Sequence, residues 1–269
     1  PVCCEYTPRD LKNMEKSNRT KLIAMHNLHL SFSELRTIRQ AIREGNLWEL
    51  VEQRIRNHPD LVDAFNLIDS CRPIFEKNEK IYKKHGRLFV SNESLKRPLF
   101  HRFDNRIKSQ YRPPEQSKFL TIFPTLDLKG KNSPSIRRWL EDINHLSSSK
   151  RLLVHIIFYS DFFGFIPLEL SNTYPMGQYE SFQLKEPGNR VPYHARRRVQ
   201  RFLKFHSKNY ERCYLMIPEK ITNQYGEEVS FSNQELLLEL STLIEDNSEL
   251  SCITVSEVSK LRDLIMEDI

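Results

Sequence analysis

The first 58 residues carry apolar side chains at helical spacing and show no alternating run that would indicate a strand. Ser31 followed by Glu34 has the spacing of a capping box and predicts that a helix starts there. Gly45 predicts its end, because glycine is favoured at the residue that closes a helix. The apolar stripe of this helix consists of Leu35, Ile38 and Ile42. The segment is small and one-sided, so we expect it to pack on something else.

After residue 118 the pattern changes to short apolar runs that alternate with helical stripes. The predicted strands cover residues 119–123, 152–159, 213–217 and 252–255, and the predicted helices cover 133–145, 193–206, 233–244 and 256–266. Such alternation is typical of a parallel sheet covered on both faces. The sequence therefore predicts an α/β fold, in which an N-terminal helical segment precedes a doubly wound, mostly parallel, three-layer α/β domain. Ligands of these sheets bind beyond the carboxyl ends of the strands, here after Phe123 and Tyr159.

Between these two regions lies a basic, weakly periodic stretch. Pro113 and Pro114 interrupt it, because consecutive prolines exclude the hydrogen bonds of helices and sheets. We place a domain boundary there. The predicted organisation is a helical tail at 1–58, a basic helical connector at 59–118 and the α/β domain at 119–269.

The charge is distributed unevenly along the 269 residues, whose formal net charge is +6. Basic residues outnumber acidic ones by 13 to 5 between residues 72 and 118 and by 9 to 2 between 185 and 212, whereas residues 219–269 hold 3 basic and 12 acidic ones. This distribution favours a surface with one positive side, as polyanion-binding proteins have. Basic helix faces that are merely solvated give the same counts.

The remaining composition bears on the compartment. The longest apolar run, residues 152–159, is far shorter than the ~20 residues that a membrane span requires. Five cysteines, an odd number in a chain of this length, favour a reducing compartment over a disulfide scaffold. We therefore expect a cytoplasmic protein with no membrane partner. His155 lies within a buried strand and is expected to be a hydrogen-bonded core histidine.

Cys3 and His26 are side chains of the types that bind zinc, although a structural zinc site needs four ligands. The stretch around Cys3, together with His26 and the asparagine after it, resembles the zinc-site end of the archaeal tRNA-guanine transglycosylase family. Residues 38–54 look like the helical tail of the same core. The resemblance implies a structural zinc held by Cys3 and His26, with two further cysteine ligands just before Pro1.

Further motifs resemble archaeosine synthase, the transglycosylase paralogue. They are Ser94 to Pro98, Arg102 to Arg106, Tyr111 to Pro114, Gly164 to Leu170 with Pro167 and Glu169, and Tyr174 to Tyr179. The resemblance covers residues 1 to about 220. It implies the addition of an amine, lysine in known members, to the nitrile of a cyano-deazaguanine base in the D-loop of tRNA. It also implies three parts: a transglycosylase-like barrel, this α/β domain and an RNA-binding PUA domain.

One stretch departs from that family. Members carry a Pro-Cys motif with a lysine, a Pro-Tyr pair, a serine and a histidine after the first strand of the α/β domain. Pro124 and Lys129 match it, but Thr125 replaces the cysteine and Arg137 the histidine. A threonine hydroxyl is a far poorer nucleophile than a thiolate unless a base lies beside it. A diverged enzyme, a substrate-holding subunit and a non-catalytic tRNA binder all stay open.

The resemblance implies roles for individual residues. Lys129 and Glu169 are the predicted catalytic pair and are expected to line one cleft. Lys129 is expected to stabilise the negative charge that develops on the nitrile nitrogen, or to hold a phosphate. Glu169 is expected to bind the base or to take a proton from the amine. The predicted substrate-binding residues are Pro124, Thr125, Gly164, Pro167, Tyr174 and Tyr179. Each also has a purely structural interpretation, because loop aromatics often pack and exposed lysines are often only solvated.

The basic segments suggest a tRNA-binding face. Its predicted members are Arg196, Arg197, Arg198 and Arg201 on one helix, and Arg102 and Arg106 on the connector. The leading hypothesis is an archaeal tRNA-modification protein of the archaeosine pathway. The alternative is a non-catalytic tRNA-binding paralogue or partner subunit of a transglycosylase-like enzyme. The expected partners are tRNA and either a subunit that supplies the barrel or a radical enzyme that completes the modification.

Overall fold

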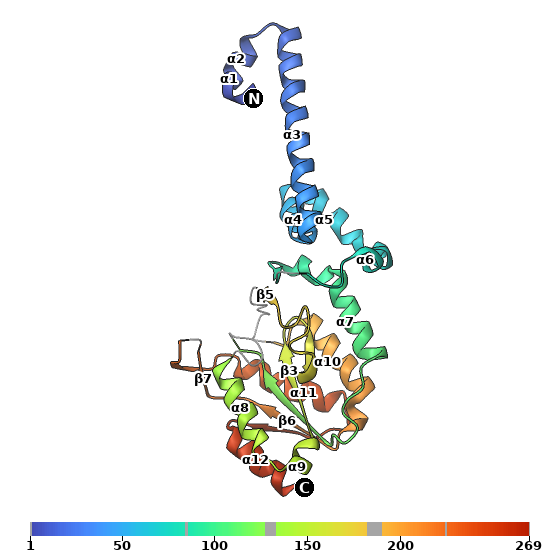
Figure 1. The fold of residues 1–269 in the computed structure, drawn as a ribbon, viewed down its shortest axis with the longest axis vertical. Coiled ribbons are helices and arrows are strands. Elements are labelled where there is room, and N and C mark those ends of the chain that lie inside the picture. Colours follow the sequence, from blue (N-terminus) through green and yellow to red (C-terminus); the bar gives the residue numbers. More distant parts are fainter. Residues whose placement is uncertain (1, 84–85, 127–132, 182–189, 224, 269) are drawn as a thin grey trace. The chain divides into compact units, whose positions relative to one another are not determined.

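The computed structural model describes residues 2–83, 86–126, 133–181, 190–223 and 225–268. The chain divides into two compact units, Pro1–Leu67 and Ile68–Ile269 (Figure 1). Each unit has its own contacts and is considered by itself. No helix among the described residues is long and apolar enough to cross a membrane.

The first unit is entirely helical in its described part. Its elements are α1 (Val2–Glu5), α2 (Pro8–Asn13), α3 (Lys16–Glu44), α4 (Leu47–Arg54), η1 (Ile55–Asn57) and α5 (Pro59–Asn66). The predicted helix start at Ser31 is wrong, because α3 is one helix of 29 residues and the Ser31 hydroxyl donates to the Asn27 carbonyl inside it. The predicted end is confirmed: Gly45 closes α3 with a left-handed φ of 74°. Nothing between Lys16 and Glu44 interrupts the helix.

Helix α3 leaves much of its apolar surface uncovered. Only Ala41 is buried along its length. Five large apolar side chains that follow one another at intervals of three, four or seven residues are 43–58% exposed: Met25, Leu28, Phe32, Leu35 and Ile42. This spacing places them on one side of the helix, the pattern by which helices pack on partners.

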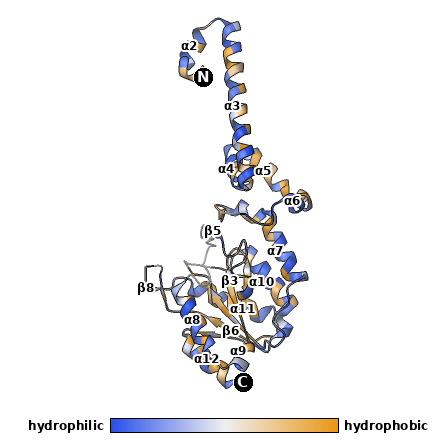
Figure 2. Cartoon of the chain, viewed as in Figure 1, coloured by the Kyte–Doolittle hydropathy of each residue, from blue (hydrophilic) through white to orange (hydrophobic). Residues whose placement is uncertain are grey.

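The second unit is built on a five-stranded sheet. Its strands are β2 (Phe119–Pro124), β3 (Val154–Ser160), β4 (Gly164–Pro167), β6 (Arg212–Met216) and β9 (Cys252–Val255), in the spatial order β4-β3-β2-β6-β9. All neighbours are parallel except β3 and β4, which are antiparallel. Every residue of β2, β3 and β4 is buried, and Figure 2 shows the hydrophobic residues concentrated in these strands. The predicted α/β fold with a mostly parallel sheet is confirmed.

Helices cover both faces of this sheet. On one face α8 (Pro134–Asn144) contacts α12 (Val258–Glu267), and on the other α10 (Tyr193–His206) contacts α11 (Gln234–Asp246). The short α9 (Ser148–Leu152) precedes β3. The Ser133 hydroxyl caps α8 as expected. The chain passes from β2 to its neighbour β3 on one side and from β6 to β9 on the other, so the winding reverses between β2 and β6.

Much of the predicted connector belongs to this second unit. It forms α6 (Arg72–Asn78), β1 (Arg87–Phe89), η3 (Asn92–Lys96) and α7 (Pro98–Ser109). Helix α7 packs on α10 and α6, and the His206 Nε2 of α10 lies 2.9 Å from the Ile107 carbonyl of α7. The shorter elements are η2 (Leu67–Cys71), η5 (Leu168–Leu170), β5 (Tyr179–Ser181), η6 (Ser207–Asn209), β7 (Lys220–Thr222) and β8 (Glu228–Ser230). β5 pairs with β1 in parallel.

The turn between β3 and β4 reverses the chain within four residues. Ser160 pairs with Gly164, and Ile157 pairs with Pro167. Gly164 has a φ of +68°, and a Cβ at this position would lie 2.7 Å from the Cβ of Arg198 on α10. This glycine is therefore required by its backbone conformation and by the close approach of α10.

We predict that Gly164→Ala lowers the free energy of unfolding by about 3 kcal/mol, from left-handed strain together with overpacking against α10. Gly226→Ala is the matched control: Gly226 has a φ of +84°, but its added Cβ would meet no atom within 4 Å in the described part of the chain. Its loss should be about 1 kcal/mol. Urea unfolding measures both, and equal losses would contradict the close approach.

Candidate functional site

Glu169 lies at the amino edge of the parallel strands, because β4 runs antiparallel and carries the chain back along β3. Its Oε1 is 3.6 Å from the Nε2 of His155, the second residue of β3. Pro124 and Thr125 lie at the carboxyl end of β2, where the Thr125 amide donates to the Tyr159 carbonyl. Glu169 therefore lies at the opposite edge of the sheet from Pro124 and Thr125, and the expected cleft between Lys129 and Glu169 stays a prediction. Lys129 itself lies outside the described residues.

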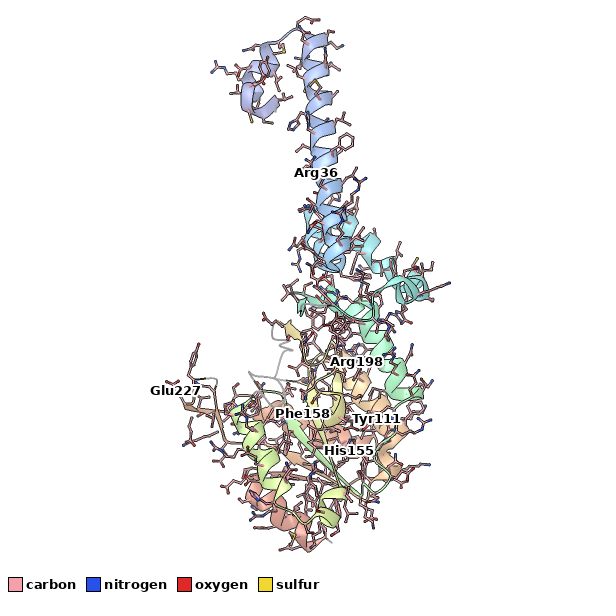
Figure 3. All side chains as sticks on the ribbon, viewed as in Figure 1. Arg36, Tyr111, His155, Phe158, Arg198 and Glu227 are labelled. Atoms are coloured by element: carbon pink, nitrogen blue, oxygen red, sulfur yellow. The ribbon has the colours of Figure 1, made fainter. Side chains whose placement is uncertain are left out.

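Four side chains form a hydrogen-bonded chain that ends on Glu169, and two of them, Tyr111 and His155, are labelled in Figure 3. The Tyr111 hydroxyl donates to Glu169 Oε1 over 2.6 Å and lies 3.0 Å from His155 Nε2, and His155 Nδ1 lies 2.6 Å from the Tyr210 hydroxyl. A neutral His155 with its proton on Nε2 satisfies all three contacts: Tyr210 donates to Nδ1, Nε2 donates to Tyr111, and Tyr111 donates to the carboxylate. The prediction of a hydrogen-bonded core histidine is confirmed.

This chain fixes the protonation of its members. Partial burial raises the pKa of Glu169, but the hydrogen bonds from His155 and Tyr111 outweigh it and leave that pKa below the ordinary carboxyl value. Burial raises the pKa of the Tyr111 and Tyr210 hydroxyls, so both stay protonated. A carboxylate with a lowered pKa is a weak base. Glu169 is therefore suited to accept hydrogen bonds and unsuited to take a proton from an amine.

The arginines of α10 do not form one exposed face. Arg198, labelled in Figure 3, is only 11% exposed in its side chain. It donates to Asp104 of α7 over 3.0 Å and to the Phe162 carbonyl over 2.8 Å, and its guanidinium lies over the Phe100 ring. Arg201 also pairs with Asp104, at 3.2 Å. Successive helix residues point about 100° apart, so a run of three cannot share a face. The prediction that Arg198 binds RNA is corrected accordingly.

The neighbouring arginines point elsewhere. Arg196 pairs with Glu239 of α11. The Arg197 guanidinium lies 5.8 Å from the ring centroid of the exposed Tyr193. Of the predicted RNA-binding residues on α10, Arg197 is exposed, and the ion-paired Arg196 and Arg201 are each partly exposed, at 36% and 37% of the side chain.

Several predicted substrate-binding residues are interior packing residues. Gly164 and Pro167 pair with β3 and are buried. Tyr179 is buried against Phe89 and Phe163, and burial raises the pKa of its hydroxyl to about 12. Its hydroxyl lies 3.1 Å from that of Ser160. No face of this ring is left for a base, so the stacking expectation is wrong for Tyr179.

Tyr174, Arg102 and Arg106 do come together, around a pocket of about 420 Å³. Its walls come from α7, from the segment after α6, and from the segment 170–176. The lining residues are Lys80, Ile81, Arg87, Leu99, Arg102, Phe103, Arg106, Ile107, Gln110, Tyr111, Arg112, Leu170, Thr173, Tyr174, Pro175 and Met176. Among these described residues five are basic and none is acidic. We call this the α7 pocket.

The basic residues of the α7 pocket differ in their partners. Arg102 donates to the carbonyls of Glu76 and Glu79 and so ties α6 to α7. Arg87 donates to the Tyr174 hydroxyl, and its guanidinium lies over the Tyr174 ring. Arg106 is exposed and forms no ion pair within the described part of the chain. The sequence analysis named Arg102, Arg106 and Tyr174 as candidate residues, but it did not predict that they line one pocket.

A signal for the pocket did exist in the sequence. Leu99, Phe103 and Ile107 recur every four residues and alternate with Arg102 and Arg106, the pattern of an amphipathic helix with a basic border. The contribution of the 170–176 segment carried no such signal, because it depends on the reversal after β3.

In the first unit, Cys3 and His26 are adjacent as predicted. The Cys3 Sγ lies 3.2 Å from the His26 Nδ1, close to the ~3.5 Å that separates a sulfur and a nitrogen on one tetrahedral zinc. Among the described residues no group of three or more His, Cys, Asp or Glu side chains could hold a metal. The residues present therefore fit half of a zinc site.

We predict that Glu169→Gln changes the acid dependence of stability. The folded-state pKa of Glu169 is lowered, so its contribution is complete above the unfolded carboxyl pKa of about 4.3 and is lost as the pH falls through the folded value. The stability difference between wild type and variant should therefore shrink below about pH 4. Thermal unfolding from pH 7 to pH 3 measures it, with Glu141→Gln on the exposed side of α8 as control. A difference independent of pH would refute the assignment.

Comparison with known proteins agrees with both units. Residues 1–60 match the family model described as TGT, queuine tRNA-ribosyltransferase. The tRNA-guanine(15) transglycosylase of Methanococcus aeolicus is 37% identical over 184 residues, 68% of this chain and 26% of the relative. That of Methanococcus vannielii is 35% identical over 179 residues (66% and 25%), and that of Thermococcus onnurineus is 36% identical over 193 (71% and 26%).

The chain thus spans about a quarter of the length of these relatives. The aligned stretches cover 179–193 residues, about two thirds of this chain. Because the first unit ends at Leu67, each stretch must include part of the second unit. The chain is therefore similar to part of the tRNA-guanine transglycosylase family, by the family-model match over residues 1–60 and by 35–37% identity to archaeal relatives.

Proposed function

We propose that this chain binds tRNA for a transglycosylase-type tRNA-modification enzyme, as its tRNA-positioning part. The observation that carries the proposal is the α7 pocket, where basic and aromatic side chains meet and none of the described lining residues is acidic. Phosphates supply most of the affinity of RNA-binding proteins, and unstacked bases pack on aromatic rings. The relatives named tRNA-guanine(15) transglycosylase support tRNA as the polyanion.

The chemistry of the described residues favours binding over catalysis by this chain. Glu169 accepts a hydrogen bond from Tyr111 and lies 3.6 Å from His155 Nε2, and Thr125 lies at the opposite edge of the sheet. The two groups cannot act on one reacting atom. This arrangement supports the role of a tRNA-binding part working with a transglycosylase-like barrel from another segment or subunit.

The second candidate is the addition of an amine to the nitrile of a cyano-deazaguanine base in tRNA, as in the archaeosine pathway. Its support is Asp161, which directly follows β3 at the carboxyl edge of the sheet. Burial raises the pKa of this carboxyl despite the opposing effect of the nearby Tyr159 hydroxyl, and a raised pKa makes a better general base. Asp161 would then take the proton that Glu169 was expected to take.

We also propose a structural zinc in the first unit. Cys3 and His26 would hold it together with two ligands from residues outside this sequence. A zinc bound this way adds folding energy by tying α1 to α3. The exposed stripe on α3 supports a partner surface from the same transglycosylase domain, since it leaves apolar area that such a domain would cover.

We predict that Arg106→Ala weakens tRNA binding and reduces the steepness of its salt dependence by about one phosphate contact. Arg262→Ala, on α12 at the other face of the sheet, is the matched control and should change neither quantity. Fluorescence anisotropy with labelled tRNA at several salt concentrations measures both. An unchanged salt slope for Arg106→Ala would exclude this residue from the tRNA contact.

We predict that Asp161→Asn, and not Glu169→Gln, abolishes amine incorporation if the chain catalyses it. Mass spectrometry of nucleosides from tRNA that carries the nitrile base gives the readout. No turnover by the wild type in the presence of firm tRNA binding would favour the non-catalytic function.

We predict that Cys3→Ser and His26→Ala each remove the zinc that purifies with the complete enzyme. A structural zinc needs four ligands, and each substitution removes one of them. Cys71→Ser, at an exposed cysteine of the second unit, should leave the zinc content unchanged. Elemental analysis by mass spectrometry gives the metal content. Retention of zinc in both ligand variants would rule out the site.

A further inference from the structure

We propose that the α7 pocket receives one unstacked nucleotide of the tRNA, with the base inside the pocket and its phosphate at the mouth. The inference rests on the proposed tRNA binding and adds a site and a mode of recognition to it. A surface that only follows the phosphate backbone needs no concave apolar lining. The α7 pocket has a concave apolar lining, so its shape and chemistry suit a ligand with an apolar ring.

The size of the pocket sets the first limit. A volume of about 420 Å³ lies within the range of about 300–1,000 Å³ in which small ligands are held. It accepts one nucleotide and is far too small for a base-paired helix. A nucleotide that enters must therefore leave its stack, as bases in single-stranded RNA loops do.

The floor and one wall are suited to a base. Leu99, Phe103 and Ile107 present the buried face of α7 to the pocket, and Met176 closes it on the opposite side. Methionine and aromatic side chains favour flat, polarisable rings.

The Tyr174 ring is held in place before a ligand arrives. Arg87 donates to its hydroxyl and lies over its ring, and the ring of Tyr82 meets it edge-on, with centroids 5.6 Å apart. Arg87 is itself buried beside Glu79, with an Nη2–Oε1 distance of 3.5 Å. A ring fixed in this way offers a stacking surface at little entropic cost.

The mouth is suited to a phosphate. Arg106 and Arg112 are exposed and line the pocket, and Lys80 adds a third cation from the segment after α6. Arg112 donates to the Tyr111 carbonyl through Nη1 over 2.8 Å, which leaves its other guanidinium donors for a ligand. With no acidic residue among the described lining residues, the local field favours an anion.

The test is a titration of the protein with a nucleoside 5′-monophosphate, the corresponding nucleoside and inorganic phosphate, followed by NMR chemical shifts. The monophosphate should bind at least tenfold more tightly than either the nucleoside or phosphate, with shifts centred on residues 99–112 and 173–176. Equal binding of inorganic phosphate and the monophosphate would overturn the inference, because the base would then contribute nothing.

Two variants locate the ligand. Met176→Trp fills the pocket from the segment 170–176, and Ile81→Trp narrows the mouth at a side chain that is 61% exposed, where added bulk cannot disturb the core. Each should weaken monophosphate binding at least tenfold and tRNA binding severalfold, with the salt slope of tRNA binding unchanged. Leu238→Trp, at an exposed residue of α11, is the control. Unaltered monophosphate binding in Ile81→Trp would refute the placement even if Met176→Trp failed to fold.

The outcomes separate this inference from the proposed function. tRNA binding without monophosphate binding would refute the nucleotide pocket and leave the tRNA-binding function standing. Monophosphate binding by a protein that does not bind tRNA would refute the tRNA-binding function and leave the nucleotide pocket standing. It would also show that the bound nucleotide does not come from tRNA.

Discussion

The antiparallel return of β4 along β3 is the constraint on which the candidate site depends. Arg198 of α10 stabilises the turn by donating to the Phe162 carbonyl, and it reaches Asp104 of α7 at the same time. Gly164 lets α10 approach closely enough for this contact. One buried guanidinium therefore ties together the turn, α10 and α7. Without the return, Glu169 would not lie at the amino edge of the sheet.

Two functional features follow from that return. The first is the hydrogen-bonded chain in which Tyr210 donates to His155, His155 donates to Tyr111, and Tyr111 donates to the Glu169 carboxylate. The second is the α7 pocket, whose far wall includes Tyr174 and Met176. Tyr111 belongs to both. Its ring lines the pocket while its hydroxyl holds Glu169, so the buried polar chain also fixes one wall of the pocket.

The basic residues of this chain serve two physically distinct purposes. Arg198 and Arg196 are used in internal ion pairs with Asp104 and Glu239, where a guanidinium offers several directed donors. Arg106 and Arg112 are exposed at the rim of a concave site. The first unit holds a separate pair of features: Cys3 and His26 lie within 3.2 Å of each other, and an apolar stripe of α3 is exposed.

The sequence by itself determined the parallel part of the sheet and the helices around it. The strands β2, β3, β6 and β9 and helix α10 follow from apolar runs and from a 3.6-residue stripe, which are local properties. The pairing of Cys3 with His26 was also predictable, because the family motif places both at one metal.

Only the tertiary structure decided where the functional side chains meet. The sequence around Gly164 contains no marker of strand direction, and the direction of β4 determines which edge of the sheet receives Glu169. Three consecutive arginines look equivalent in a sequence, but the side that faces α7 buries Arg198 and leaves Arg197 outside. Direction and burial depend on contacts between residues far apart along the chain, and such contacts leave no periodic signal within any one segment.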